Sequence, residues 1–264
     1  MRAWNIAHRG GAALRPENTP AAFGNAIGLE CDGAELDVQL SADGVAVVYH
    51  DFRLNPGYAR LRGGDWTDGP MPRIKDLTLE ELYRYDLGVV RPGSAYAEAH
   101  PDLEPANGVG MPTLEFVVRL ANILPAFRLF IELKCDTSSD SADPLTLADT
   151  AFGITKDAGF LDRAIFVGFD WRALARIREL GGTCWFTTDK LQSDARPVVD
   201  LIAASGGQGW FPNFPDATPD NVAYARTRGL KVGAWTVNDP ADMARLGDLD
   251  AICTDRPDLL QALK

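Results

Sequence analysis

The chain has 264 residues, 46% of them hydrophobic, and a formal net charge of −11. That length suits one large α/β domain with a substantial core, and the negative charge opposes binding to nucleic acid. No run approaches the ~20 apolar residues that a membrane-spanning helix needs, and the sequence does not open with the basic and apolar segments of a signal peptide. We therefore expect no nucleic-acid partner, no membrane insertion and a cytoplasmic location, whereas the oligomeric state stays open.

The four cysteines, Cys31, Cys135, Cys184 and Cys253, lie far apart and show no C-x-x-C spacing. The last three lie in or beside apolar strand candidates, where a thiol usually packs as a small hydrophobic group. We expect reduced, buried thiols.

Short apolar segments that favour β-strands alternate with helix-like segments along almost the whole chain. Several are near-continuous apolar runs, which is typical of strands buried on both faces of a parallel sheet. The predicted strands are Trp4–His8, Gly33–Gln39, Val45–Tyr49, Leu129–Leu133, Ala164–Phe169, Thr183–Thr187, Gln208–Phe211, Lys231–Thr236 and Asp250–Thr254.

Three helix starts are visible in the sequence. Thr19 precedes a proline, which favours an N-cap followed by a first-turn proline. Thr78 and Glu81 have the spacing of a capping box and predict a helix near 78–86. Thr113 predicts a further cap, for a helix that carries the apolar residues Phe116, Val117, Leu120 and Ile123.

Repeated strand–helix units over this length predict a (β/α)₈ TIM barrel, whose usual size is ~250 residues. Nine predicted strands are one more than the barrel needs. Asp43 and Gly44 form a strong hairpin-turn signal, so Val45–Tyr49 is predicted to fold back against the second barrel strand.

The region 52–112 is rich in Gly, Pro and charge and contains one convincing helix. We interpret it as a long insertion after the second barrel strand, which lies over the active face as a lid. No linker or repeat divides the chain, so residues 1–264 are predicted to form a single domain.

Three carboxylates stand out within or at the ends of apolar strands. Glu35 and Asp37 are two residues apart on one strand and share a face, where they repel each other unless a cation lies between them. Glu132 adds a third carboxylate at the end of another strand. Ordinary ion pairing would explain one such acid, but three unpaired acids in apolar strands are costly. An all-oxygen set favours Mg²⁺ or Ca²⁺ over zinc.

Two of the three histidines, His8 and His50, lie at strand ends near these acids. Imidazole titrates near neutral pH, so the two are natural candidates for a general acid and a general base. A lone histidine is more often structural, and the third, His100, lies in the region 52–112, where we expect it to be exposed and inert.

These residues lie in short sequence motifs, called words below, that resemble those of the glycerophosphodiester phosphodiesterase family. The motifs follow the family's order and cover essentially the full length of the chain. The resemblance implies a TIM barrel, a divalent metal, and hydrolysis of deacylated phospholipid head-group esters to glycerol 3-phosphate and an alcohol. The words are I-A-H-R-G-G and R-P-E-N-T within 6–19, G-A-E-L-D-V (33–38), V-V-Y-H-D (47–51), D-L-T-L-E-E-L (76–82), M-P-T-L-E (111–115), I-E-L-K (131–134), G-A-W-T-V-N (233–238) and T-D-R-P (254–257).

Four further residues are candidates for substrate binding. Lys134 is two residues beyond Glu132, so it shares that strand face, and the resemblance assigns it to the bound phosphate. Arg9 offers a forked donor for phosphate oxygens. Glu17 and Asn18 begin the first helix, and a mere helix-start role competes with an active-site one. The resemblance places Glu17 at the site, where it orients Arg9 or a ligand group. Trp235 closes a barrel strand and would pack against the glycerol.

The identity of the leaving alcohol stays open. After H-D the chain reads F-R-L-N-P-G-Y, where the common pattern continues toward an arginine with paired threonines. Four aromatic residues would be able to bind choline through cation–π contacts, although packing in the core or surface is the stronger interpretation. They are Tyr58, Trp66, Trp171 and Trp210.

Two alternative functions predict features of their own. A phospholipase that cleaves intact lipid would need an exposed apolar rim or a membrane-binding helix, and none is visible. A catalytically inactive binding module would lack a histidine or a metal ligand, and none is missing. The nucleophile, either water or the substrate's 2-hydroxyl through a cyclic phosphate, stays open.

Overall fold

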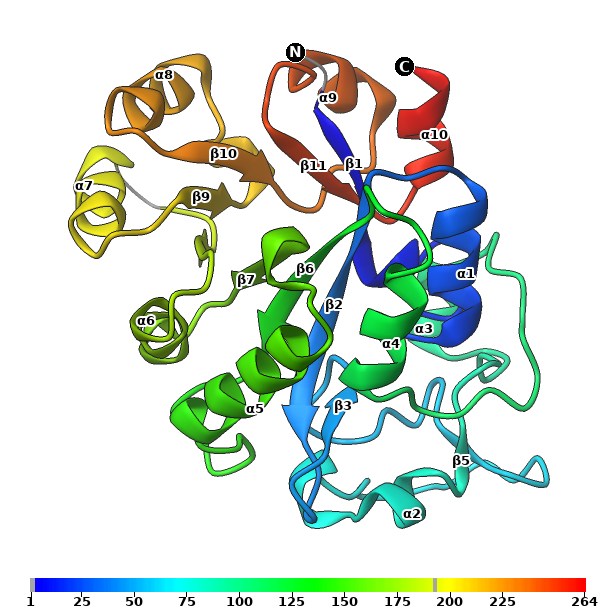
Figure 1. Cartoon of the computed structure of the whole chain (residues 1–264). Helices are drawn as coiled ribbons and strands as arrows, with labels where there is room; N and C mark the ends of the chain where they lie inside the picture. The colour runs from blue at the N-terminus through cyan, green and yellow to red at the C-terminus, as the bar shows by residue number, and fades with distance from the viewer. Residues whose placement is uncertain (1–2, 192–193) are drawn as a thin grey trace.

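A parallel eight-stranded barrel forms the centre of the computed structural model, which describes residues 3–191 and 194–264 (Figure 1). The hydrogen-bonded order is β7-β6-β2-β1-β11-β10-β9-β8, and a parallel bridge between Phe166 and Cys184 joins the two ends. The predicted TIM barrel is confirmed. Its strands are β1 (Trp4–Ala7), β2 (Gly33–Leu40), β6 (Arg128–Leu133), β7 (Ala164–Val167), β8 (Trp185–Thr188), β9 (Gly209–Pro212), β10 (Lys231–Ala234) and β11 (Ala251–Thr254).

The predicted hairpin is also present. Strand β3 (Ala46–Val48) pairs antiparallel with β2, with Val38 opposite Val48. Gly44 in the turn has a φ of 76°, a conformation that glycine adopts without steric cost. The hairpin returns the chain to β2, so that the backbone amide of Tyr49 donates to the carbonyl of Asp37 at 2.9 Å.

Helices connect successive barrel strands and cover the outside of the barrel (Figure 1). They are α1 (Pro20–Gly28), α4 (Leu114–Ala121), α5 (Pro144–Asp157), α6 (Trp171–Glu179), α7 (Arg196–Ala204), α8 (Pro219–Thr227), α9 (Pro240–Arg245) and α10 (Pro257–Ala262), and the short 3-10 turns η1 (His8–Gly10), η3 (Leu161–Arg163) and η4 (Phe214–Asp216) lie in the loops. None of the described helices is long and apolar enough to cross a bilayer.

The predicted N-caps are confirmed, but some details around them were wrong. Thr19, Thr78 and Thr113 each accept a hydrogen bond from a backbone amide in the first turn of α1, α2 (Leu79–Leu82) and α4, respectively. Glu17 lies before α1 rather than in it. Ile123 lies beyond the end of α4, which stops at Ala121, and is 69% exposed.

The alternation of β2 separates its two faces. Leu36 and Val38 point outward and pack with the helices in the main hydrophobic layer. Glu35 and Asp37 therefore point into the barrel, whose interior is otherwise closed by apolar side chains such as Phe130. All four cysteines are buried and free, as predicted.

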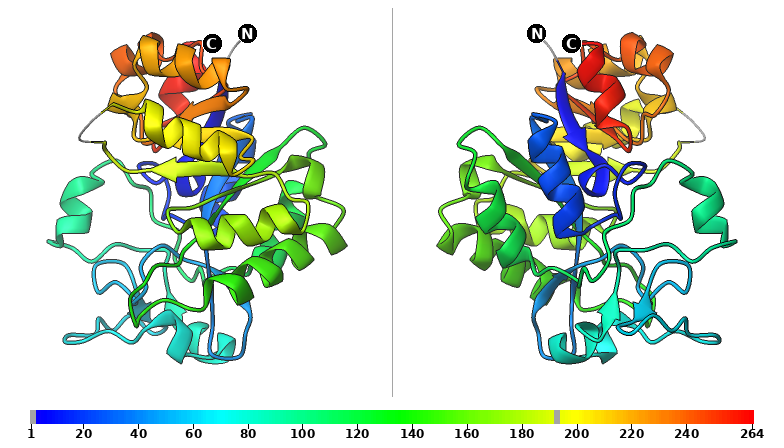
Figure 2. Two further views of the ribbon diagram at one scale, coloured as in Figure 1. Left: turned by 90° about the vertical axis from the view of Figure 1, so that its left-hand side faces the viewer. Right: turned by 90° about the vertical axis from the view of Figure 1, so that its right-hand side faces the viewer.

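Residues 52–112 contain short elements with a small core of their own. Figures 1 and 2 show this segment, cyan to teal, beside the barrel and beyond the end of β2. Buried Tyr49, Leu54, Met71 and Leu82 belong to its core. The helix predicted near 78–86 is present but ends at Leu82. The segment also contains two-residue strands and a second helix. Its elements are β4 (Arg60–Leu61), η2 (Ile74–Asp76), α2 (Leu79–Leu82), β5 (Tyr85–Asp86) and α3 (Ala95–Ala99).

Candidate active site

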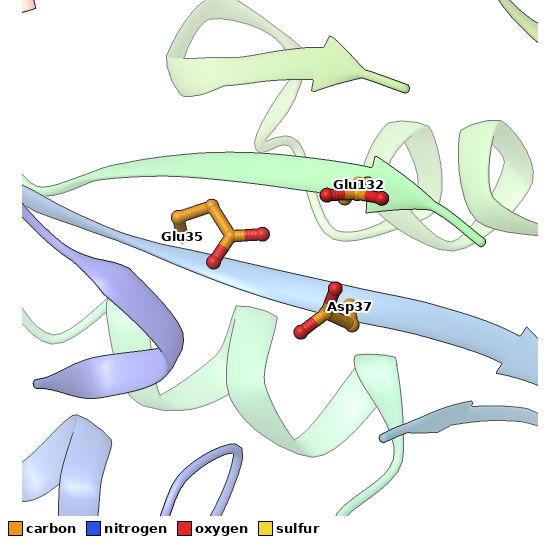
Figure 3. Close-up of side chains that lie close together, drawn as sticks. All are labelled: Glu35, Asp37 and Glu132. Atoms are coloured by element: carbon orange, nitrogen blue, oxygen red, sulfur yellow. The ribbon is translucent and has the colours of Figure 1, made fainter. Parts of the chain in front are cut away.

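Three carboxylates from two neighbouring strands meet inside the barrel (Figure 3). Asp37 on β2 is in register with Glu132 on β6, and Glu35 lies two residues before Asp37. One oxygen atom of each carboxylate lies within 4.8 Å of the others. Glu35 and Asp37 are almost completely buried, while Glu132 is partly exposed. The strand register therefore brings together the three acids that the sequence singled out.

Burial acts differently on the two acids of β2. Burial would raise the pKa of Asp37, but Arg9, His50 and Lys134 hold it well below its usual range. Burial and the neighbouring carboxylates Asp37 and Glu132 raise the pKa of Glu35 well above its ordinary value. Of these two acids, Glu35 is thus the one whose negative charge is less balanced by neighbouring positive charges.

The cluster fits a bound hard cation. Glu35 Oε1 is buried and has no hydrogen-bond partner within the described part of the chain, which is costly unless a ligand meets it. A divalent ion beside that oxygen would also offset the repulsion from Asp37 and Glu132. The donor atoms are all carboxylate oxygens, which Mg²⁺ and Ca²⁺ prefer over thiolate or imidazole nitrogen.

Lys134 lies against the same acids. Its Nζ is 2.9 Å from Oε1 of Glu132 and 3.8 Å from Oδ1 of Asp37. Burial would lower the pKa of Lys134, but these two carboxylates raise it, so the ammonium stays charged. The side chain also lines the cavity described below, where its charge can meet an anionic group.

Arg9 is held in place by its backbone and by two acids. Its φ of 50° is left-handed, and the following Gly10 has no room for a side chain, because a Cβ there would lie 2.6 Å from Cβ of Ala22. The Nη1 atom donates to Oε1 of Glu17 at 2.9 Å, and Nε lies 3.2 Å from Oδ2 of Asp37. The predicted neighbourhood of Arg9 and Glu17 is thus observed.

Asn18 belongs to this cluster but was not predicted. It is buried with a φ of 55°, and its Nδ2 donates to Oδ2 of Asp37 at 2.8 Å. Its Oδ1 accepts from the backbone amide of Asp37 at 3.3 Å. The available signal was its place beside Glu17 in the word R-P-E-N-T, since a non-glycine residue with positive φ is most often Asn or Asp.

Each candidate catalytic histidine has a carboxylate at Nδ1. His8 Nδ1 lies 2.6 Å from Oδ1 of Asp255, and His50 Nδ1 lies 2.7 Å from Oδ1 of Asp51. A carboxylate that accepts from Nδ1–H fixes the ring orientation and leaves Nε2 for the chemistry. Nε2 of His8 lies 3.9 Å from Oε2 of Glu35, so it faces the carboxylate cluster.

These two aspartates were not predicted from the sequence as site residues. Burial opposes ionisation of Asp255, but His8 and a 2.7 Å hydrogen bond from Asn238 Nδ2 lower its pKa to about 2. Asp51 likewise has a lowered pKa: hydrogen bonds from His50 and Asn55 outweigh its burial. The words T-D-R-P and H-D contained both residues. The pairing of Asp255 with His8 joins distant strands and leaves no local pattern, whereas Asp51 directly follows His50, so its signal was present in the sequence.

A cavity of about 260 Å³ lies above the acids and has two unlike sides. His8, Arg9, Glu35, His50, Glu132 and Lys134 form the polar side. The other side carries Phe169, Phe211 and Trp235. Trp235 meets Phe169 edge to face at 5.4 Å and donates from Nε1 to the carbonyl of Phe211 at 3.0 Å.

The four aromatic residues considered for choline do not line this cavity. Trp210 is fully buried and donates to Thr188 Oγ1, which places it in the core. Tyr58 is buried in the core of the segment 52–112, and Trp66 lies between two arginines. Trp171 lies over a neighbouring cavity that shares only Phe169 with the first.

The expectation that His100 is exposed was wrong. It is half-buried, and its ring stacks on Tyr96 with a centroid separation of 4.2 Å. Its Nδ1 also donates to the carbonyl of Tyr96 at 2.9 Å. His100 follows α3 directly, four residues after Tyr96, and this spacing brings the two rings together.

Comparisons with known proteins agree with this geometry. The model of the glycerophosphoryl diester phosphodiesterase family matches residues 8–259. A glycerophosphodiester phosphodiesterase from Bacillus altitudinis is 38% identical over 96% of this chain and 94% of its own length. A structure from Silicibacter pomeroyi, provisionally named a glycerophosphoryl diester phosphodiesterase, superposes with a TM-score of 0.91 at 29% identity, covering 98% of this chain and 91% of its own.

A third protein shows the same fold with a bound product. The Oleispira antarctica phosphodiesterase, solved in complex with its product sn-glycerol 3-phosphate, has a TM-score of 0.77 at 23% identity. The match covers 97% of this chain and 94% of that one. At this identity the likeness supports the barrel fold alone.

Proposed function

The chain belongs to the glycerophosphoryl diester phosphodiesterase family, and on that premise we propose that it hydrolyses glycerophosphodiesters, releasing glycerol 3-phosphate and an alcohol. One observation carries the proposal: two histidines, a charged lysine and two members of the carboxylate cluster line one cavity together with three aromatic side chains. A phosphodiester needs cationic groups for its oxygens and proton donors and acceptors for its two exchanged oxygens. The polar side supplies both.

We propose that Glu35, Asp37 and Glu132 hold a divalent cation, Mg²⁺ or Ca²⁺. When bound, such an ion neutralises the charge that develops on the phosphoryl oxygens. The protein itself contributes the ammonium group of Lys134, which lines the cavity and is poised to contact a phosphoryl oxygen. Arg9 adds a second positive charge at the cavity wall, held by Glu17 and Asp37.

We propose that His8 and His50 move the protons. One imidazole takes a proton from the attacking hydroxyl, and the other gives a proton to the departing alcohol oxygen. Asp255 and Asp51 support this role, because each carboxylate holds one imidazole through Nδ1 and stabilises its cationic form.

We propose that Trp235, together with Phe169 and Phe211, packs against the carbon atoms of the glycerol. The edge-to-face contact of the Trp235 and Phe169 rings forms a firm apolar wall opposite the acids. A glycerol backbone has an apolar carbon face and polar hydroxyl groups, so it complements a cavity with these two sides.

We also propose that residues 52–112 act as a lid within a single domain. The segment lies beside the active face and contacts the site through Asp51 and Glu17. The described residues that line the cavity include none from this segment. Its influence on the alcohol would therefore be exerted where a head group extends out of the cavity.

A substrate panel tests the proposed function. Purified protein is incubated with glycerophosphocholine, glycerophosphoethanolamine, glycerophosphoglycerol or glycerophosphoinositol, with added Mg²⁺ or Ca²⁺, and the release of glycerol 3-phosphate is measured. Phosphatidylcholine vesicles serve as the control for cleavage of intact lipid. Turnover of at least one diester is expected. Turnover of the vesicles alone, or of no substrate by folded protein, would contradict the proposal.

A further inference from the structure

We propose that Tyr96, in the segment 52–112, is a positioning residue of the active site that acts through Glu17. Its hydroxyl donates to Oε2 of Glu17 at 2.7 Å, across 79 positions of the sequence. The other oxygen of the same carboxylate, Oε1, accepts from Nη1 of Arg9 at 2.9 Å. Glu17 thus joins a helix of the segment to a residue of the cavity wall. The inference rests on the proposed function.

The environment of Glu17 makes both hydrogen bonds matter. The Glu17 side chain is only 4% exposed, so water has little access to its oxygens. Each oxygen has one protein donor, either Arg9 or Tyr96. A buried carboxylate oxygen that loses its donor is left unsatisfied, and the side chain is then free to turn toward another partner.

Tyr96 is itself firmly seated. Its ring packs between Tyr58, at a centroid separation of 4.6 Å, and His100, at 4.2 Å. Helix α3, which carries Tyr96, is capped by Ser94, whose Oγ accepts from the amide of Ala97 at 3.1 Å. The hydroxyl is therefore presented to Glu17 by a packed element rather than by a loose loop.

The position of Arg9 matters to the carboxylate cluster. Its Nε lies 3.2 Å from Oδ2 of Asp37, and its backbone amide donates to Oε2 of Glu35 at 3.1 Å. A shift of the guanidinium would change the charge next to Asp37 and the shape of the cavity wall. Neither Tyr96 nor Glu17 is among the residues that line the cavity, so Tyr96 would influence turnover without touching the substrate.

The test removes one oxygen atom. Tyr96→Phe keeps the ring between Tyr58 and His100 but deletes the donor to Glu17. We expect kcat/KM to fall by roughly tenfold or more, the usual effect of losing a hydrogen bond to a charged group. The matched control is Tyr224→Phe, which deletes a 2.9 Å hydrogen bond to the carboxylate of Asp200 on the outer helices. Its kcat/KM should stay within about twofold of wild type.

A double-mutant cycle tests the route through Glu17. In a Glu17→Gln background, Tyr96→Phe should lower kcat/KM by far less than it does in the wild-type background, because the carboxylate that it serves is gone. A merely structural role for Tyr96 would lower the thermal midpoint and would give the same loss in both backgrounds. Measurements are made well below the midpoints of all variants.

The outcomes are distinct. Wild-type kcat/KM for Tyr96→Phe, or an equal loss in both backgrounds, would overturn the inference. If Tyr96→Phe does not fold, Glu17→Gln decides alone: Tyr96 can act only through this carboxylate, so wild-type kcat/KM in that variant would overturn the inference too. Failure of the proposed function is recognised separately, because the wild-type protein would then release no glycerol 3-phosphate from the substrate panel.

Discussion

His8 Nδ1 lies 2.6 Å from Oδ1 of Asp255, which joins the ends of the first and last barrel strands across 247 positions of the sequence. The pairing follows from the strand register. Ala7 on β1 is opposite Thr254 on β11, so the next residue of each strand leaves the barrel at the same level. The closure of the barrel thereby places a carboxylate behind the imidazole.

The first prediction concerns this pair. Asp255→Asn should lower kcat/KM by about 10²-fold or more, because a neutral amide neither stabilises the imidazolium nor holds the correct tautomer. Asp258→Asn is the matched control, since Asp258 on α10 pairs with Arg256 at 2.7 Å. An Asp255→Asn enzyme with wild-type kcat/KM would remove Asp255 from the active site.

The second prediction concerns acid stability. The pKa of Asp255 is about 2 in the folded protein, against 3.8 ordinarily, so its carboxylate stabilises the fold above pH ~4. That contribution, about 2 kcal/mol, should be lost as the pH falls from about 4 to about 2. Urea unfolding at pH 6, 4, 3 and 2 measures it. The gap in unfolding free energy between wild type and Asp255→Asn should shrink toward acid pH, and a constant gap would contradict the prediction.

The third prediction concerns the metal. Chelation should abolish activity, and added Mg²⁺ or Ca²⁺ should restore it, because Glu35, Asp37 and Glu132 are proposed as ligands. Glu132→Ala should weaken metal binding in calorimetry while the fold persists, since its side chain is partly exposed. Glu115→Ala on the surface of α4 is the control. Full activity in exhaustively chelated, metal-free protein would refute the assignment.

The fourth prediction distinguishes the proposed lid role of residues 52–112 from the proposed positioning role of Tyr96. Replacing residues 92–101 by a short glycine linker should change the ranking of head groups, if this part of the segment contacts the alcohol. Tyr96→Phe should instead lower kcat/KM for all head groups by a common factor, because it acts through Glu17 and Arg9. The same ranking in the shortened variant, with its fold verified by circular dichroism, would argue against a lid.

The barrel and the acid cluster were predictable because both follow local rules. Strand alternation alone puts Glu35 and Asp37 on one face, and the same rule joins Glu132 to Lys134. The Thr78 capping box is a pattern of four residues, so it too was found in advance. Such features need no knowledge of distant parts of the chain.

The remaining features depend on contacts between distant residues. Strands β4 and β5 are only two residues long and are stabilised by Asp86, which accepts from Arg60 and from the amide of Gly108. The partnership of Tyr96 with Glu17 likewise joins residues 79 positions apart. No local periodicity encodes such pairs. The contact of His100 with Tyr96 is instead local, four residues apart at the end of α3, and it was missed together with that short helix.

The last prediction concerns the two histidines that we propose to be catalytic. His8→Ala or His50→Ala should each lower the rate by roughly 10²–10⁴-fold, the usual contribution of a positioned proton-transfer group. The two losses should not multiply in the double variant, because the residues act as a unit. The pH profile of kcat/KM should be bell-shaped, since one imidazole must be neutral while the other is protonated. His100→Ala, the third histidine, should keep the wild-type profile and lose at most about tenfold through its packing on Tyr96.

A change of leaving group assigns the two roles. In a nitrophenyl ester of glycerol phosphate, the nitrophenolate leaves without needing a proton. This substrate should therefore restore turnover in the variant that lacks the general acid, whereas the variant that lacks the base should stay slow. The comparison uses the ratio of kcat/KM for the nitrophenyl ester to that for glycerophosphocholine in each variant. A ratio that rises in only one variant identifies the acid, whereas equal ratios in both would exclude a division of labour between His8 and His50. Near-wild-type turnover of a natural diester by His50→Ala would refute the two-histidine mechanism itself.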